Sequence, residues 1–290
     1  MKGVKRKDIP TGIAFLAPAL ILIFIFTIIP IFEAVYTSFH DTNYAVITDF
    51  VCWENYKEIL GKSIGWANIL NSIEYVALSL LFAVPIGVGI GSLLNRKIHG
   101  RTLLRTLIII PWTLSQTVTA LLWKWLLNGN YGLVTWWHYK LTGEKIDLFN
   151  KAITAKFLVV FANVWNSVPI IIILTIAALQ TISPELYEAA RVDGANRRTM
   201  YFQLTLPLIR PNIMTAIVMQ SIEYFNMVTL IFIMTDGGPF NQTQTLSLAA
   251  YQNGFEYWHL GIASAYSIII FLLNIIFSLI YVKLLKKSDS

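Results

Sequence analysis

Six long apolar stretches alternate with shorter polar segments along the 290 residues of the chain. A helix that spans a bilayer needs about 20 mostly apolar residues, and each stretch is long enough. The stretches lie at about 11–39, 69–94, 103–127, 154–180, 207–235 and 259–282. The pattern predicts an all-α integral membrane protein, with six transmembrane helices in a single transmembrane domain over residues 1–290.

One polar segment, residues 183–206, carries many charges of both signs between two strongly apolar stretches. We call it the polar hairpin. Ser183 is a favourable N-cap, and Gly194 offers a backbone at which a short helix can end. A second helical segment is expected from about Asn196 to Pro207, where the next apolar stretch begins. The local pattern fits a docking surface of two helices around a glycine bend, and it fits a solvated loop equally well.

Composition agrees with the membrane class, since 56% of the residues are hydrophobic, 13% are charged and the mean hydropathy is +0.62. The formal net charge of +6 and the pI near 9.3 are compatible with nucleic-acid binding. However, no polar segment carries a basic stripe interleaved with aromatic residues, so we expect no nucleic-acid partner. The expected surroundings of the apolar stretches are the lipid bilayer.

The Lys and Arg residues are distributed unequally between the two sides of the predicted membrane. With the N-terminus inside, fifteen lie in inner segments and six in outer segments. Because cytoplasmic segments carry the excess of Lys and Arg, both termini and the polar hairpin are predicted to be cytoplasmic. The first apolar stretch is too long for a signal peptide and has no clear cleavage site, so we interpret it as an uncleaved span.

Residues for catalysis or metal binding are not gathered anywhere in the sequence. Cys52 is the only cysteine, so neither an internal disulfide nor a cysteine-based zinc site is expected. Gly61-Lys62-Ser63 is similar to the end of a P-loop, but Tyr56 stands where the leading glycine is required. The sequence therefore predicts no catalytic residues, no metal site and no cofactor, and the chain is not expected to be an enzyme.

Within the polar hairpin, Glu188-Ala189-Ala190 is followed by Asp193-Gly194-Ala195 and then by Phe202, Leu206 and Pro207. This ordered set resembles the EAA loop of bacterial ABC-importer permeases, which lies in a cleft of the ATP-hydrolysing subunit. The resemblance implies a type I importer permease fold with cytoplasmic coupling helices. The residues it implies for ATPase coupling are Glu188, Ala189, Ala190, Asp193, Gly194 and Ala195.

A second resemblance narrows the family. Residues 234–267, MTDGGPFNQTQTLSLAAYQNGFEYWHLGIASAYS, are similar to the segment between the fifth and sixth spans of sugar-importing permeases of the maltose and glycerol-phosphate type. This implies a permease of a carbohydrate importer in a bacterial inner membrane. The implied partners are a second permease subunit, two ATPase subunits that carry ATP and magnesium, and an extracytoplasmic solute-binding protein, with a sugar as substrate.

The resemblance also implies where the sugar is held, because maltose-type permeases bind it midway through the membrane on the third, fourth and fifth spans. The matching positions are Trp112, Gln116, Asn163, Ser167, Glu223, Tyr224 and Met227. The positions that differ in kind from the maltose type are Trp112, Gln116, Glu223 and Met227. The solute is then a different oligosaccharide or a more polar compound, or the partner permease binds it instead.

Glu223 is a charged residue that the pattern places in mid-membrane. A charge there costs on the order of 3 kcal/mol on insertion scales, so the side chain should face a cavity or a partner. Three roles fit it: a solute contact, a structural hydrogen bond to a neighbouring helix, and the titrating group of an ion-coupled secondary transporter. An intramembrane enzyme would need a nucleophile–base pair or a metal set at this depth, which the sequence does not offer.

Overall fold

The computed structural model of the protein describes residues 8–44, 46–96 and 99–286. The described part of the chain divides into two compact units. Unit 1 consists of the residues up to 62 together with 250–269, and unit 2 consists of residues 63–249 together with those from 270 onward. One transmembrane domain over the whole chain stays a prediction.

Unit 1 contains the first apolar helix and a small β-hairpin. Its elements are α1 (Asp8–Ile23), η1 (Phe24–Ile28), α2 (Ile29–Ser38), β1 (His40–Asn43), β2 (Val46–Phe50), α3 (Glu54–Gly61), η3 (Gln252–Glu256) and the start of α14 (Leu260–Lys286). The first three elements follow one another directly, and they include an apolar helix, Phe15–Ser38, at the place of the first predicted span.

The sequence pattern does not predict the antiparallel β1–β2 hairpin of unit 1. The side-chain amide of Asn55 donates hydrogen bonds of 3.0 Å to the carbonyl oxygens of Ser38 and His40. The N–H of Gly261, far along the chain, donates to the Thr42 hydroxyl at 3.1 Å. Strands of four and five residues give too short a periodic signal, and distant contacts such as these hold them in place.

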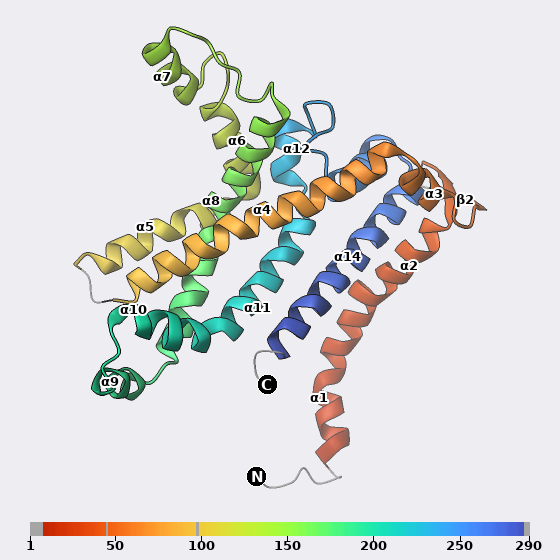
Figure 1. The fold of residues 1–290 in the computed structure, drawn as a ribbon. Helices are drawn as coiled ribbons and strands as arrows, with labels where there is room; N and C mark the ends of the chain where they lie inside the picture. Colours follow the sequence, from red (N-terminus) through yellow and green to blue (C-terminus); the bar gives the residue numbers. More distant parts are fainter. Residues whose placement is uncertain (1–7, 45, 97–98, 287–290) are drawn as a thin grey trace. The chain divides into compact units, whose positions relative to one another are not determined.

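Unit 2 is built around two long helices, α4 (Ser63–Leu94) and α8 (Ala152–Gln180), which pack against each other. Figure 1 shows α7 and α9 at opposite ends of α8, as expected for a helix that crosses a membrane. The other elements of unit 2 are α5 (Arg101–Thr113), α6 (Gln116–Leu126), α7 (Leu133–Thr142), α9 (Pro184–Val192), α10 (Arg197–Thr199), η2 (Met200–Thr205), α11 (Leu206–Phe225), α12 (Thr229–Thr235), most of α13 (Leu246–Tyr251) and the rest of α14.

Helices α4 and α8 approach closely because α4 carries glycine where the two meet. A Cβ atom placed on Gly87 would lie 2.5 Å from Cγ2 of Ile171, and one on Gly91 would lie 2.8 Å from Cβ of Thr175. A Cβ atom on Gly89 would have no such neighbour within 4 Å. Residues four apart share a helix face, so Gly87 and Gly91 together let α8 come close.

Two of the predicted spans are bent pairs of helices. Helices α5 and α6 meet at 95°, and the helix Arg197–Phe225 meets α12 at 50°. At the first bend the Ser115 backbone is extended, and its side-chain oxygen accepts a 3.3 Å hydrogen bond from the Val118 N–H. Ser115 is thus an N-cap, and α6 begins there as a new helix.

The predicted spans are confirmed to be helical. Among the described residues, four helices are long and apolar enough to span a bilayer, and the number is six if each bent pair is one span. The four are Phe15–Ser38, Ser63–Leu94, Ala152–Gln180 and Leu260–Lys283. They lie where the first, second, fourth and sixth apolar stretches are.

Candidate functional site

The polar hairpin begins with helix α9, whose two ends are fixed by local hydrogen bonds. At the start, the Ser183 side-chain oxygen accepts a bond from the Glu185 N–H at 3.3 Å. At the end, Gly194 has φ +79°. Its N–H donates a hydrogen bond to the Arg191 carbonyl at 3.0 Å, and the Ala195 N–H donates to the Ala190 carbonyl at 2.9 Å. This is a Schellman motif, which favours glycine at the left-handed position. The predicted helix between Ser183 and Gly194 is confirmed.

The second helix of the polar hairpin continues without a break into the fifth predicted span. Asn196 caps it, because its side-chain oxygen accepts a 2.9 Å hydrogen bond from the Thr199 N–H. The helix then runs from Arg197 to Phe225 and passes Pro207 just after the π-helical turn η2. Proline at this place therefore marks the entry into the span but does not end the helix.

Two pairs of hydroxyl groups tie the polar hairpin together and to α4. The hydroxyls of Tyr187 in α9 and Thr205 in η2 lie 3.2 Å apart, and those of Tyr201 in η2 and Ser92 in α4 lie 3.3 Å apart. A hydrogen bond of this kind contributes about 0.5–1.5 kcal/mol net. The first pair holds α9 against the helix that follows it, and the second holds that helix against α4.

The exposed surface of α9 combines charged and apolar side chains. Leu186 is 44% exposed and Val192 is 87% exposed, on a helix that also carries exposed carboxylates. Of the predicted coupling residues, the exposed ones are Glu188, Ala189, Asp193 and Gly194, and the half-buried ones are Ala190 and Ala195. Exposed apolar side chains rimmed by polar ones are typical of a surface that binds another protein.

Three of the predicted solute residues meet in a buried network that joins α4, α8 and α11. The hydroxyls of Ser167 and Tyr224 lie 2.6 Å apart, and the Gln220 side-chain amide donates to the same Tyr224 oxygen at 3.1 Å. One turn before Ser167, the Asn163 side-chain amide donates to the Ser79 hydroxyl at 3.1 Å. All five side chains are buried. Their hydrogen bonds hold the three helices together.

The other predicted solute residues lie outside that network. Trp112, near the end of α5, is 49% exposed, and Gln116 starts α6, so the two flank the 95° bend. Met227 is buried just after α11. Glu223 is exposed although its neighbour Tyr224 is buried. Neither ion pair found in the described part of the chain involves Glu223.

Residues 83–289, well over half of the chain, match the family described as "Binding-protein-dependent transport system inner membrane component". The chain belongs to this family. The matched region includes the polar hairpin and all the predicted solute residues. The prediction of an importer permease from the hairpin motif is therefore confirmed, and the permease is a multi-pass membrane protein.

The permease also resembles individual proteins over nearly its full length. It is 30% identical to the trehalose/maltose transport system permease protein MalF of Thermococcus litoralis, over 97% of the chain and 95% of that protein. It is 29% identical to the sulfoquinovosyl glycerol transport system permease protein SmoG of Agrobacterium fabrum, over 96% and 91%. A chain of a bacterial alginate ABC transporter, crystallised with an alginate pentasaccharide-bound periplasmic protein, has a TM-score of 0.83 at 21% identity, over 95% and 93%. The permease thus has the importer-permease fold.

Asn166 of the permease is a polar residue that the motif comparison does not select. Its side-chain amide donates to the Pro111 carbonyl in α5 at 2.7 Å and to the Thr119 hydroxyl in α6 at 3.1 Å. It thereby ties α8 to both arms of the 95° bend. Two features of the sequence could have indicated this contact: a proline inside the third predicted span and an amide side chain in the fourth. A proline interrupts a helix, and the carbonyl groups that it frees need other hydrogen-bond donors.

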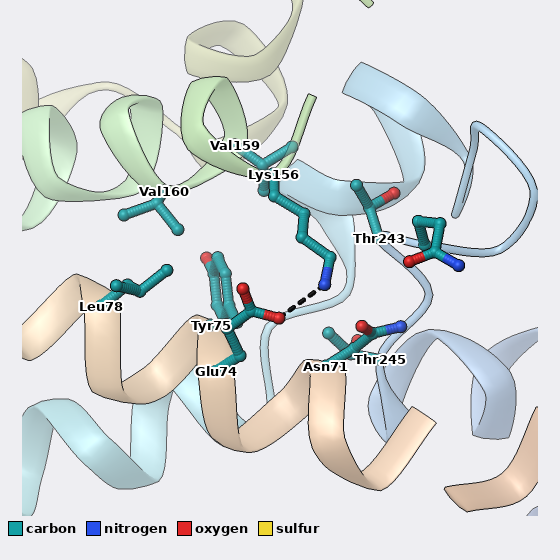
Figure 2. Close-up of a pocket in the computed structure, with 10 residues that line it drawn as sticks. Asn71, Glu74, Tyr75, Leu78, Lys156, Val159, Val160, Thr243 and Thr245 are labelled. Carbon is teal, nitrogen blue, oxygen red and sulfur yellow. Dashed lines mark hydrogen bonds and ion pairs between the residues drawn. The ribbon is translucent and has the colours of Figure 1, made fainter. Parts of the chain in front are cut away.

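A small cavity lies between α4, α8 and the segment before α13 (Figure 2). Glu74 of α4 and Lys156 of α8 form a 2.5 Å ion pair at this cavity. The Tyr75 hydroxyl beside them is buried and has no hydrogen-bond partner in the described part of the permease. The cavity measures about 20 Å³, which suits one water molecule and is too small for a sugar.

Tyr224→Phe is expected to destabilise the permease by roughly 1–3 kcal/mol, because it leaves the buried Gln220 amide without its acceptor. Tyr75→Phe is the matched control. Its ring is also buried, with its centroid 6.4 Å from that of Tyr224, but its hydroxyl has no partner to lose among the described residues. Thermal unfolding of both variants in one detergent checks this, and equal shifts would contradict the role of the network.

Proposed function

We propose that the permease is one subunit of an ATP-driven ABC importer for a sugar or oligosaccharide. Two relatives are named for transport of trehalose/maltose and of sulfoquinovosyl glycerol, and both names describe carbohydrate compounds. The permease pairs with a second permease, two ATPase subunits and an extracytoplasmic solute-binding protein. ATP and magnesium are bound by the ATPase subunits, so the permease itself is not an enzyme.

The observation that carries this proposal is the capped polar hairpin, with an exposed acidic and apolar face, on a helix that runs on into the fifth span. Helix α9 docks into the ATPase, and closure of the ATPase subunits displaces it. The helix Arg197–Phe225 is unbroken and roughly 40 Å long at 1.5 Å per residue, so it transmits this displacement into the membrane. Coupling then needs two discrete arrangements of this helix, and both ATP and solute bias their equilibrium.

The solute path is lined by the predicted residues that the helices leave at least partly accessible: Trp112 and Glu223 are exposed, and Gln116 is half-buried. An aromatic ring packs on the C–H face of a sugar, and the amide and the carboxylate accept or donate hydrogen bonds to its hydroxyls. Exposed polar groups at membrane depth are costly in lipid, which supports placing them toward a path shared with the second permease. The remaining predicted residues are buried, and three of them, Asn163, Ser167 and Tyr224, fix the helix positions by hydrogen bonds, while Met227 is buried just after α11.

The permease lies in a bacterial inner membrane with both termini and the polar hairpin in the cytoplasm. The excess of Lys and Arg in the inner segments supports this orientation. It also brings α9 to the side where ATP is available. An outward-facing polar hairpin, shown by labelling an introduced cysteine from outside, would contradict the proposal.

Uptake of radiolabelled maltose and trehalose into proteoliposomes tests the function. The complete importer is expected to accumulate at least one of these sugars, or another saccharide, only with ATP and with the solute-binding protein. Uptake by this chain alone, driven by a proton gradient without ATP, would instead establish an ion-coupled carrier, for which Glu223 is the candidate titrating group. The family assignment favours the ATP-driven importer over that alternative.

Glu223→Gln is expected to change sugar uptake or the preference among sugars by about tenfold, the effect of losing one charged hydrogen bond. Glu144→Gln, an exposed change after α7, is the matched control and should transport like the wild type. Initial uptake rates for a panel of saccharides measure both variants. Unchanged rates and preferences in Glu223→Gln would leave this carboxylate with no role in solute recognition.

A further inference from the structure

A second cavity of the permease, of about 420 Å³, lies between the polar hairpin and the ends of α4 and α8. Three arginines from three different elements line it: Arg96 just after α4, Arg191 in α9, and Arg197 at the start of the helix that leads into the membrane. Tyr187, Tyr201 and Ser92, whose hydroxyls form the hydrogen bonds described above, also line it. Guanidinium groups and hydroxyls are hydrogen-bond donors, so the cavity is rich in donors.

The positive charge of this cavity is not balanced within the described part of the permease. No aspartate or glutamate is among its lining residues. The two ion pairs found among the described residues, Glu58–Lys62 and Glu74–Lys156, involve none of the three arginines. The carboxylates of the polar hairpin, such as Glu188, are exposed and do not line the cavity.

Helix capping explains two of the three arginines but not the third. Arg96 follows the C-terminus of α4, and Arg191 is in the last turn of α9, where a cation interacts favourably with the helix dipole. Arg197 is in the first turn of its helix, where the dipole disfavours a cation. An anion in the cavity removes that conflict, since it is attracted both by the guanidinium groups and by the start of this helix.

We propose that this cavity binds a phosphate group, supplied by the headgroup of an anionic phospholipid or by free phosphate. The planar guanidinium fork matches phosphate oxygens, and basic pockets at the cytoplasmic ends of spans suit anionic headgroups. The inference goes beyond the proposed function, because it concerns neither the sugar nor ATP hydrolysis. A phosphate bound there links α4 to both helices of the polar hairpin, and it stiffens the hairpin relative to the spans.

The test compares Arg197→Gln with the matched control Arg198→Gln. Arg198 is the neighbouring arginine, exposed like Arg197, but it is not among the residues that line the cavity. The full-length permease, with the subunits that copurify, is placed in nanodiscs of phosphatidylcholine with a minority of phosphatidylglycerol. Native mass spectrometry then counts the phosphatidylglycerol that survives a detergent wash. In a second arm, inorganic phosphate is titrated into lipid-free detergent samples while thermal unfolding is followed.

The wild type and Arg198→Gln are expected to bind alike, and Arg197→Gln about tenfold more weakly, because it loses a charged hydrogen-bond donor. Loss of bound phosphatidylglycerol from Arg197→Gln in the first arm identifies a lipid headgroup as the ligand. Loss of phosphate-dependent stabilisation of this variant in the second arm identifies free phosphate. Arg191→Gln should behave like Arg197→Gln, which guards against a variant that simply misfolds. The proposal is overturned if both arms give the same result for all variants, or if Arg197→Gln releases the ATPase subunits while lipid and phosphate binding are unchanged.

Discussion

Glu188→Lys is expected to reduce ATP-dependent sugar uptake by about tenfold or more while the membrane fold stays intact, because like charges at an interface cost several kcal/mol. Glu188 is exposed on α9 and belongs to neither ion pair of the described residues, so its substitution removes no internal contact of that kind. The exposed carboxylate of Glu188 calls for a basic or donor-rich group opposite it on the ATPase, which a lysine repels. Copurification of the ATPase and sugar uptake per ATP hydrolysed measure the effect.

The control for this prediction is Asp49→Lys, the same charge change at an exposed position of β2. The positive-inside distribution predicts that this strand is on the outer side, away from the ATPase. Both variants should unfold at the temperature of the wild type, which separates loss of docking from loss of fold. If Glu188→Lys keeps the ATPase bound and transports at the rate of the wild type, α9 is not the coupling element.

The polar hairpin could be predicted closely from the sequence because its ends are local. The Ser183 cap reaches two residues along the chain, and the hydrogen bonds that close α9 around Gly194 reach at most five. Residue preferences at caps and left-handed turns therefore carry most of the information. The family motif lies on the same residues, so structure and identification followed from one short segment.

The candidate solute site was harder to predict because it depends on how each helix is rotated. Glu223 and Tyr224 are adjacent in α11, yet the first is exposed and the second is buried. In a span that is apolar on most sides, periodicity does not show which face meets other helices. The Tyr224 face is set by Ser167 of α8, 57 residues away. The resemblance to maltose-type permeases indicates which positions correspond, but not which way their side chains face.

The bends and the β-hairpin escaped prediction for a related reason. The 95° bend between α5 and α6 is supported by Asn166, whose amide reaches both arms from α8. The β1–β2 hairpin is anchored by Asn55 and Gly261. In both places a side chain distant in sequence satisfies backbone or hydroxyl groups. A hydropathy pattern records the apolar stretch but not such a partner.

Gly91→Leu is expected to destabilise the permease by about 1–3 kcal/mol, because overpacking forces neighbouring atoms apart. A Cβ atom at Gly91 would lie 2.8 Å from Cβ of Thr175 and 3.1 Å from the Ile172 carbonyl oxygen. Neither neighbour is the free end of a flexible side chain, so the helices α4 and α8 must separate. Since these helices form the core of unit 2, the buried Asn163–Ser79 hydrogen bond between them should also weaken.

Gly89→Leu is the matched control, because it adds the same side chain to the same helix where a Cβ atom has open space. Both substitutions raise helix propensity equally, so the difference between them reports only the contact with α8. Thermal unfolding in detergent should separate the two variants by several degrees, given about 2–4 °C per kcal/mol for a chain of this class. In the double variant Gly91→Ala/Thr175→Gly, the Cβ atom of residue 175 that would clash with the new Cβ atom of residue 91 is absent. The double variant should therefore recover part of the stability that Gly91→Ala alone loses. If Gly89→Leu proved as damaging as Gly91→Leu, close packing of α4 on α8 through the glycine face would be contradicted. The proposed displacement of the helix Arg197–Phe225 would then have no rigid pair of helices to act on.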